Sequence, residues 1–176
     1  MSHVPLSEPP RQSLRRAVPA DAPALATLRY AFRTQDYPGK ASTFEERESF
    51  LARCVPWMTE RLARENCGGW RCWLVELQDR GDRRMVGGQL WLQAIEKIPN
   101  PAAEPELHAY ISNVYVLPEL RGRGLAGQLL DLALTWCRQH AVDQVILWPS
   151  EKSRPLYARH GFAVSDGVLV TRIREA

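Results

Sequence analysis

The sequence lacks the features that would place the protein in a membrane or outside the cell. No run of apolar residues approaches the ~20 that a membrane-spanning helix requires. The first ten residues also lack the apolar core of a signal peptide. We therefore expect a cytoplasmic protein with no membrane partner.

Cysteine and clustered positive charge are also scarce. The chain has four cysteines, with no Cys-x-x-Cys pair and no matching histidine spacing, so we predict neither a disulfide framework nor a metal site. Arginine is scattered, and the formal net charge of +3 is mild. Without a concentrated basic face, a nucleic-acid partner is not expected.

Length and composition indicate one globular domain. With 45% hydrophobic and 24% charged residues, the 176 residues can bury a full core. The first twelve residues are rich in proline and polar side chains. We therefore predict a disordered N-terminal tail over residues 1–12 and a single domain over residues 13–176.

Hydrophobic periodicity predicts both strands and helices. Strands are expected at residues 14–18, 73–77, 85–94, 108–116 and 145–148, with a closing hairpin of residues 162–164 and 168–172 around Asp166 and Gly167. Helices are expected from Ala22, from Thr43 and from Leu125. Thr43 with Glu46 has the pattern of a capping box, and that helix should run towards Arg64.

Residues 114–127 are the most informative segment, because they read as a strand that turns through a glycine loop into a helix. Val114 and Val116 lie on one face of the strand, and Tyr115 lies on the other. Pro118 removes a ladder donor and ends the strand. The loop therefore stands where a helix begins.

This position suits an anion. The first N–H groups of a helix have no intrahelical partners, and the helix dipole is positive at that end. Gly122 and Gly124 would let a ligand approach the backbone closely, while Arg121 and Arg123 add two positive charges. The pattern predicts a pyrophosphate-binding loop.

Two other glycine loops have related sequences. A P-loop requires Gly-Lys-Ser or Gly-Lys-Thr, and neither occurs in the chain. Gly122, Gly124 and Gly127 match the Rossmann string, and Asp143 follows at about the right distance of roughly 20 residues. That loop, however, normally follows the first strand of a βαβ unit and lacks two arginines.

Two motifs resemble one enzyme family. Read as Arg121-x-x-Gly124-x-Ala126, the loop resembles the acetyl-CoA motif of the GNAT superfamily of N-acetyltransferases. Further on, Tyr157 stands four residues before a Gly-Phe pair, which is similar to the GNAT ending. The distinctive motifs cover residues 113–162.

The resemblance implies an α+β fold in three layers. In that family a mixed, mostly antiparallel sheet is flanked by helices, and its parallel fourth and fifth strands splay apart. Acetyl-CoA is the co-substrate, and its pantetheine arm fills the gap and pairs with the fourth strand. The residues implied to bind it are Asn113, Val114, Tyr115, Val116, Arg121, Gly122, Arg123, Gly124, Leu125, Ala126, Gly127, Ser150 and Ser153.

Ser150 and Ser153 carry a structural alternative. They fall where the family often has an asparagine and an alanine that contact the arm. Either serine could instead be the N-cap of a short helix.

Tyr157 is the residue implied to act in catalysis. Its hydroxyl would protonate the thiolate that leaves when an amine attacks the thioester. The alternative is a core tyrosine whose hydroxyl donates to a carbonyl.

The base that deprotonates the amine is not evident. The family often places a glutamate or histidine where this chain has Ser112 and Tyr110. His108 lies one step further along the same face and could act through a water, with Glu106 beyond it. The other reading is that there is no dedicated base, because the acceptor amine has a low pKa.

Aromatic side chains gather where the acceptor would bind, although about half of them should be core residues. They are Tyr30, Phe32, Tyr37, Phe44, Trp57 and Trp91.

We therefore predict an N-acetyltransferase, monomeric or homodimeric, that transfers acetyl from acetyl-CoA to a small-molecule or protein amine. The alternatives are a catalytically weak CoA-binding sensor of the same fold and, more distantly, a dinucleotide-binding oxidoreductase.

Overall fold

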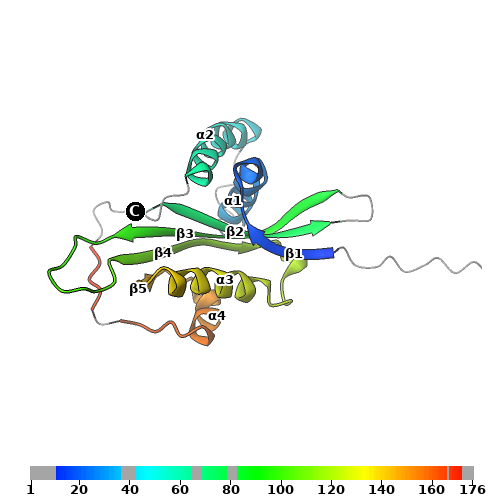
Figure 1. Cartoon of the computed structure of the whole chain (residues 1–176). Coiled ribbons are helices and arrows are strands. Elements are labelled where there is room, and N and C mark those ends of the chain that lie inside the picture. The colour runs from blue at the N-terminus through cyan, green and yellow to red at the C-terminus, as the bar shows by residue number, and fades with distance from the viewer. Residues whose placement is uncertain (1–10, 37–42, 65–68, 79–82, 166, 172–176) are drawn as a thin grey trace, which may run out of the picture.

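The computed structural model describes residues 11–36, 43–64, 69–78, 83–165 and 167–171. Within them one twisted sheet lies between two layers of helices (Figure 1). The elements in chain order are β1 (Arg11–Arg16), α1 (Ala22–Asp36), α2 (Phe44–Ala63), β2 (Trp70–Gln78), β3 (Arg84–Glu96), β4 (Leu107–Val116), α3 (Leu125–Gln139), β5 (Val142–Ile146) and α4 (Arg154–Arg159).

The five strands are arranged in sequence order, β1-β2-β3-β4-β5. The first four pair antiparallel, and β5 lies parallel to β4. Helices α1 and α2 cover one face of the sheet, and α3 and α4 cover the other (Figure 1). The predicted α+β fold in three layers, with one parallel strand pair, is confirmed.

Strand β2 is buried on both faces and joins two cores. Trp73, Val75 and Leu77 belong to the core beneath α3, whereas Cys72 and Leu74 belong to the core beneath α1 and α2. Successive residues of a strand point to opposite faces, so one continuous apolar run fills both layers.

The turn into α1 is fixed by an ion pair. Asp21 accepts hydrogen bonds from the N–H of Val18 at 2.8 Å and from the Arg15 guanidinium at 2.8 Å. Arg15 also binds Glu76 of β2 at 2.7 Å. The Arg15 guanidinium holds the pKa of the Asp21 carboxyl below its usual value, so the pair ties β1, β2 and the start of α1 together.

The prediction for β1 was wrong in its boundaries. The strand was expected at residues 14–18, but it begins at Arg11, and Arg11 already pairs with Gln78. Backbone pairing at a sheet edge does not require apolar side chains, so the hydrophobic pattern missed the polar start of the strand. The predicted tail therefore cannot extend to residue 12, and residues 1–10 lie outside the described part of the chain.

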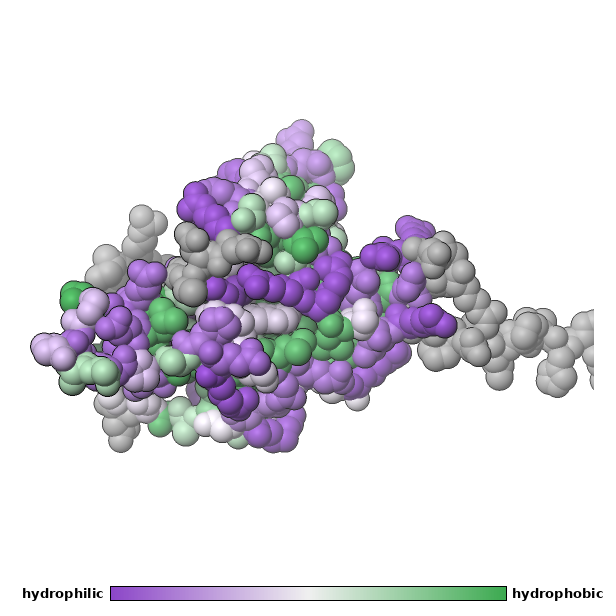
Figure 2. Space-filling model, in the orientation of Figure 1, coloured by the Kyte–Doolittle hydropathy of each residue, from purple (hydrophilic) through white to green (hydrophobic). Residues whose placement is uncertain are grey.

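The C-terminal prediction was also wrong. No strand forms in residues 162–165 or 167–171, and Asp166 and residues 172–176 lie outside the described residues. Leu169 is 97% exposed, and Figure 2 shows hydrophobic residues along the lower edge of the molecule, where this segment runs. Alternating apolar residues suit a strand, but a strand also needs a neighbour to pair with.

Strand β5 begins and ends earlier in the sequence than predicted, for a related reason. It was expected at residues 145–148 but spans Val142–Ile146, which is the stretch that pairs with β4. The residues after it have no strand beside them. No helix in the described part of the chain is both long and apolar enough to cross a membrane.

Thr43 should contribute measurably to stability. The predicted capping box is present, because the Thr43 hydroxyl accepts from the N–H of Glu46 at 3.2 Å and Glu46 accepts from the N–H of Thr43 at 2.7 Å. We expect Thr43→Ala to lower the free energy of unfolding by about 1 kcal/mol in a denaturant titration. Thr43→Ser keeps the acceptor oxygen and should restore most of the loss; equal stability of all three proteins would contradict the assignment.

Candidate active site

The predicted glycine loop connects β4 to α3 through two left-handed residues. After β4 ends at Val116 and a short turn follows, Gly122 has a φ of 77° and Gly124 a φ of 74°. An L-residue is strained in this conformation by about 1–2 kcal/mol, so glycine is required at both positions. Gly124 is the N-cap of α3 and has no side chain that could satisfy the helix end.

The loop leaves a set of backbone donors without protein partners. Within the described residues, no N–H group of residues 122–127 donates to a protein acceptor, and the first to do so is that of Gln128, to Gly124 at 3.0 Å. Six consecutive N–H groups at the positive end of a 15-residue helix are an arrangement that suits an anion. Pyrophosphate binding by this loop stays a prediction.

Arg121 and Arg123 add charge to this loop. The Arg121 Nε donates to the Val116 carbonyl at 3.0 Å, and its guanidinium lies 5.6 Å from the centre of the Tyr115 ring. Arg123 is exposed and makes only a long contact of 3.5 Å to the Glu119 carbonyl. Neither arginine forms an ion pair with a carboxylate of the described chain, so neither charge is neutralised there; the Arg121 guanidinium also lies 3.5 Å from Gln35 Oε1 of α1.

The three residues that open α3 have different tasks. The Leu125 side chain is buried in the core, so only its backbone faces the loop. A Cβ on Gly127 would lie 3.4 Å from the His160 ring, an ordinary van der Waals contact, so this glycine lies where α3 and α4 meet. Ala126 is half-buried between these two.

Strands β4 and β5 pair over only part of their length. Residues 107–110 of β4 lie beside residues 142–146 of β5, and the pairing stops at Tyr110 opposite Ile146. From Ile111 to Val116 the edge of β4 that faces β5 has no strand partner in the described chain. The predicted splay is confirmed, and it leaves backbone donors and acceptors for an extended ligand.

Asn113 marks a distortion in the unpaired half of β4. It has a φ of 54°, and the β3–β4 register shifts between Gln89 and Trp91 at the same level. Its side chain points towards α1, where the Asn113 Oδ1 accepts from Arg29 Nη1 at 3.2 Å. The side chain is therefore engaged by the protein, and the backbone remains for a ligand.

Tyr157 is nearly buried in α4. It is 9% exposed, and its ring packs edge-on against Phe162 with centroids 5.8 Å apart. It belongs to the core beneath α3, as the structural alternative expects, but its hydroxyl donates to no carbonyl among the described residues, and its role stays a prediction. Burial raises the pKa of the Tyr157 hydroxyl, so the group keeps its proton at neutral pH.

A cavity of about 540 Å³ lies beside Tyr157. Its walls come from β5 and the residues after it, from α4 and from the C-terminal segment; they include Ile146, Trp148, Pro149, Tyr157, Phe162 and Val168. Tyr157 therefore stands between the core and open space.

Ser150 and Ser153 bind each other. Ser150 Oγ donates to Ser153 Oγ at 3.1 Å, and Ser153 Oγ donates to the Ser150 carbonyl at 2.9 Å. Both occupy N-cap positions, but neither side chain caps a helix N–H. The pair stabilises the turn before α4, and the exposed Ser150 can still accept a ligand hydrogen bond.

His108 lies in the half of β4 that is still paired with β5. It faces Ile95 across β3 and Gln144 across β5. Its Nδ1 is buried and has no hydrogen-bond partner within the described residues. An unsatisfied buried nitrogen has a cost, which a bound water or a ligand would remove.

Aromatic rings form a continuous wall on the α2 side of the point where the strands separate. Tyr110 packs edge-on against Trp148 at 5.0 Å and against Trp70 at 6.5 Å between ring centroids. Trp70 in turn lies 5.4 Å from Trp57 and 6.2 Å from Trp91. We call Trp57, Trp70, Trp91, Tyr110 and Trp148 the aromatic wall.

The aromatic residues predicted for the acceptor site lie in several places, and their role in acceptor binding stays a prediction. Trp57 and Trp91 belong to the wall, but Trp91 is buried and Phe44 is 77% exposed at the start of α2. Tyr30 packs on Phe50 and Phe32 on Tyr115, and Tyr37 lies outside the described residues. Trp70 was not predicted, because its sequence position looks like an ordinary strand residue.

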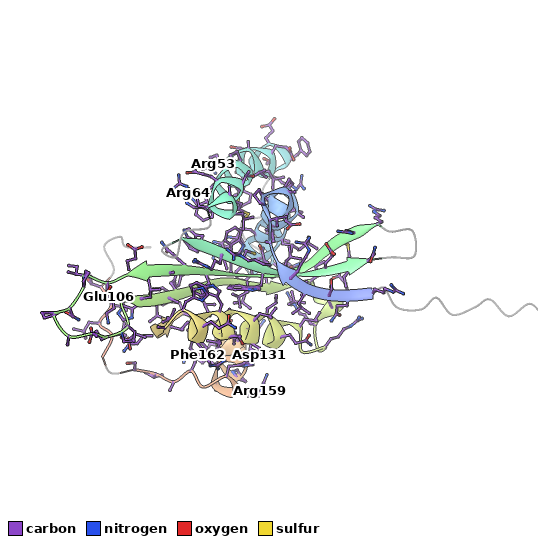
Figure 3. The ribbon with its side chains drawn as sticks, viewed as in Figure 1. Arg53, Arg64, Glu106, Asp131, Arg159 and Phe162 are labelled. Carbon is purple, nitrogen blue, oxygen red and sulfur yellow. The ribbon has the colours of Figure 1, made fainter. Side chains whose placement is uncertain are left out.

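The two faces of the sheet carry different side chains. Asp131, Arg159 and Phe162 lie on the side of α3 and α4, whereas Arg53 and Arg64 lie on α2 on the opposite side (Figure 3). His160 contacts Asp131 at 3.4 Å and joins α4 to α3. The glycine loop and the aromatic wall thus flank one unpaired strand edge.

Comparison with protein families agrees with this geometry. The profile described as "Acetyltransferase (GNAT) family" matches residues 41–162, which is more than half of the chain. The chain belongs to the GNAT acetyltransferase family. Acetyl-CoA is the co-substrate of that family, as the sequence motifs predicted. No curated protein matches the sequence.

Several solved structures share the fold. A predicted acetyltransferase with acetyl-CoA from Clostridium acetobutylicum superposes with a TM-score of 0.70 at 20% identity, covering 93% of this chain and 97% of that one. A GCN5-related N-acetyltransferase from Ralstonia eutropha gives 0.66 at 21% identity, with 92% and 99% covered. Glucosamine-6-phosphate N-acetyltransferase from Arabidopsis thaliana gives 0.65 at 13% identity, with 93% and 99% covered.

The ionisation of Tyr157 can be measured directly. Because burial disfavours the phenolate, we expect Tyr157 to titrate above the ordinary tyrosine pKa of about 10. NMR of tyrosines labelled at Cζ should show a late-titrating signal that is absent from Tyr157→Phe, with circular dichroism confirming that the fold persists. Titration of that signal at or below the ordinary value would show that the hydroxyl is solvated.

Proposed function

We propose that this GNAT protein is an N-acetyltransferase that moves an acetyl group from acetyl-CoA to a primary amine by direct attack. The observation that carries the proposal is the unpartnered backbone of the glycine loop, placed beside the unpaired edge of β4. These two features present donors for phosphates and for an extended amide chain on one continuous surface.

The residues present fit the donor. The N–H groups of residues 122–127 and the charges of Arg121 and Arg123 would hold the pyrophosphate. The backbone of Asn113 to Val116 would pair with the pantetheine arm, whose amide groups resemble a peptide. Ser150 is the remaining polar group at the far wall of the gap, in the turn after β5.

The chemistry needs one bond made and one broken. The amine nitrogen attacks the thioester carbon, the C–N bond forms, the C–S bond breaks, and the nitrogen loses a proton. A backbone N–H on the unpaired edge near Val116 would stabilise the oxyanion. Tyr157, which keeps its proton, would supply it to the departing thiolate.

His108 of β4 is the residue that we propose for removal of the amine proton. His108 has an unsatisfied buried Nδ1 and lies two residues before Tyr110, so it could act through a water. The alternative is an acceptor amine that is already neutral at the working pH. Ser112 and Tyr110 are not bases at neutral pH.

The acceptor is a small molecule rather than a protein in this proposal. An aromatic surface suits a small apolar amine, whereas a protein substrate suits a shallow or acidic cleft. The aromatic wall runs from α2 to the residues after β5 and offers apolar area beside the point where the strands separate.

A second function is a CoA-binding sensor of the same fold. It is favoured by one observation, that no carboxylate stands at Tyr110 or Ser112. A sensor would bind acetyl-CoA and acetylate no amine.

Acetyl-CoA should stabilise the folded protein, and Gly124→Glu should abolish the effect. The glutamate would place a negative charge at the N-cap, where the pyrophosphate must lie. At ~100 times its dissociation constant, acetyl-CoA should add about 2.7 kcal/mol to the stability of the wild type. Thermal unfolding with and without ligand measures the difference.

Gly124→Ala is the matched control, because it carries the backbone strain without the charge. It should lower the melting temperature of the free protein but retain part of the response to acetyl-CoA. A wild-type melting temperature that does not change with acetyl-CoA would remove the basis of the proposal.

Tyr157→Phe should lower turnover and leave acetyl-CoA affinity nearly unchanged. The hydroxyl acts only as the thiolate forms, so its loss appears in kcat, and general acid catalysis is typically worth ~10²–10⁴-fold. The ring remains against Phe162, and a denaturant titration should show little change in stability. Full turnover with an acceptor whose chemistry limits the rate would mean that solvent protonates the thiolate.

A further inference from the structure

Arg29 is an arginine of α1 that faces the distorted part of β4. Its Nη1 donates to Asn113 Oδ1 at 3.2 Å, and its guanidinium lies 5.8 Å from the centre of the Phe32 ring. The side chain is half-buried between α1, α2 and the sheet. It is thus held by an amide and a ring, both of which are neutral.

No carboxylate within the described chain pairs with Arg29. The charged neighbour that affects it most is Arg33, which is of the same sign, and burial together with Arg33 lowers the pKa of Arg29. The other groups that bear on its charge are Cys54 of α2 and Tyr110 of β4. A guanidinium in this position remains charged, and an anion would offset more of its desolvation than the neutral Asn113 amide and Phe32 ring do.

The position of Arg29 relates it to the reaction. Asn113 is three residues beyond Tyr110, so Arg29 reaches the unpaired half of β4 on the same face of the sheet as the aromatic wall. Tyr110 is the last residue of β4 that pairs with β5. A cation and a flat apolar surface therefore flank the place where the strands separate.

We propose that Arg29 is the anchor for a carboxylate on the acceptor, and that the acceptor is a primary amine carrying both a carboxylate and an aromatic group. The class includes the aromatic amino acids. Arg29 would hold the carboxylate through its remaining N–H groups, the aromatic wall would hold the ring, and the amine would lie between them. This inference rests on the proposed acetyl transfer.

The experiment measures how fast the full-length protein acetylates matched pairs of acceptors with acetyl-CoA as the donor. Phenylalanine and phenethylamine share the amine and the ring and differ in the carboxylate, and tryptophan and tryptamine form a second pair. We expect the wild type to prefer the amino acid of each pair in kcat/KM by about 10- to 100-fold, the range of a charge-assisted hydrogen bond.

Arg29→Leu should remove that preference. It should lower kcat/KM for the amino acid to the level of the amine, chiefly through KM, and leave the amine little changed. Arg29→Lys keeps the charge and should restore part of the preference. Arg53→Leu is the control, because Arg53 is an exposed arginine of α2 that projects away from the sheet (Figure 3), and it should behave as wild type.

A measurement on the wild type alone guards against a variant that does not fold. 3-Phenylpropionate keeps the ring and carboxylate without the amine, and it should compete with the acceptor; 3-phenylpropanol, which lacks the charge, should not. Equal inhibition by the two would overturn the inference.

The remaining outcomes separate this inference from the proposed function. If the wild type does not prefer the carboxylated acceptor, or if Arg29→Leu lowers both acceptors of a pair equally, Arg29 only supports Asn113 and the inference is overturned. If acetyl-CoA raises the melting temperature but neither acceptor is acetylated, the inference falls and the donor site stands. If acetyl-CoA gives no shift, the proposed function falls as well.

Discussion

The end of backbone pairing between β4 and β5 is the constraint on which the rest of the site depends. Two parallel strands that pair along their whole length satisfy each other's backbone hydrogen-bonding groups. Here the pairing of β4 with β5 stops at Tyr110, and the six residues of β4 that follow have no strand partner on that side. Buried backbone groups need partners, so an open edge inside a folded domain calls for a ligand with amides of its own. The glycine loop lies at one end of this edge and the aromatic wall at the other.

Local features were predictable from the sequence because nearby residues determine them. The start of α3 at Leu125, the capping box of Thr43 and the alternation of Val114, Tyr115 and Val116 all depend on neighbours within a few positions. Glycine at positions 122 and 124 permits the positive φ that the loop adopts there, although several other glycines of the chain do not adopt it. The splay, in contrast, came from the family resemblance, because no local pattern shows where two strands part.

Features that join distant segments escaped the prediction. Arg29 and Asn113 are 84 residues apart, and nothing near Arg29 distinguishes it from the other scattered arginines. Trp70 of β2 and Trp148, which follows β5, join one wall only because Tyr110 of β4 packs against both rings. The predictions for the edge strand β1 and for the C-terminal segment were wrong for another reason. Hydrophobicity indicates which side chains could be buried, but it does not indicate which strand edges are paired.

The donor side of the site consists largely of main-chain groups, and this affects how freely the sequence can vary. A backbone N–H is the same for every residue, so substitutions along β4 or at the start of α3 leave those contacts in place as long as the chain keeps its path. Gly122 and Gly124 are fixed by conformation, and Asn113 also has a positive φ. A protein can thus diverge to 20% identity from a structural neighbour and still superpose on it with a TM-score of 0.70. Selectivity for the acceptor amine must then depend on side chains, so that a single substitution there directly changes which acceptor can bind.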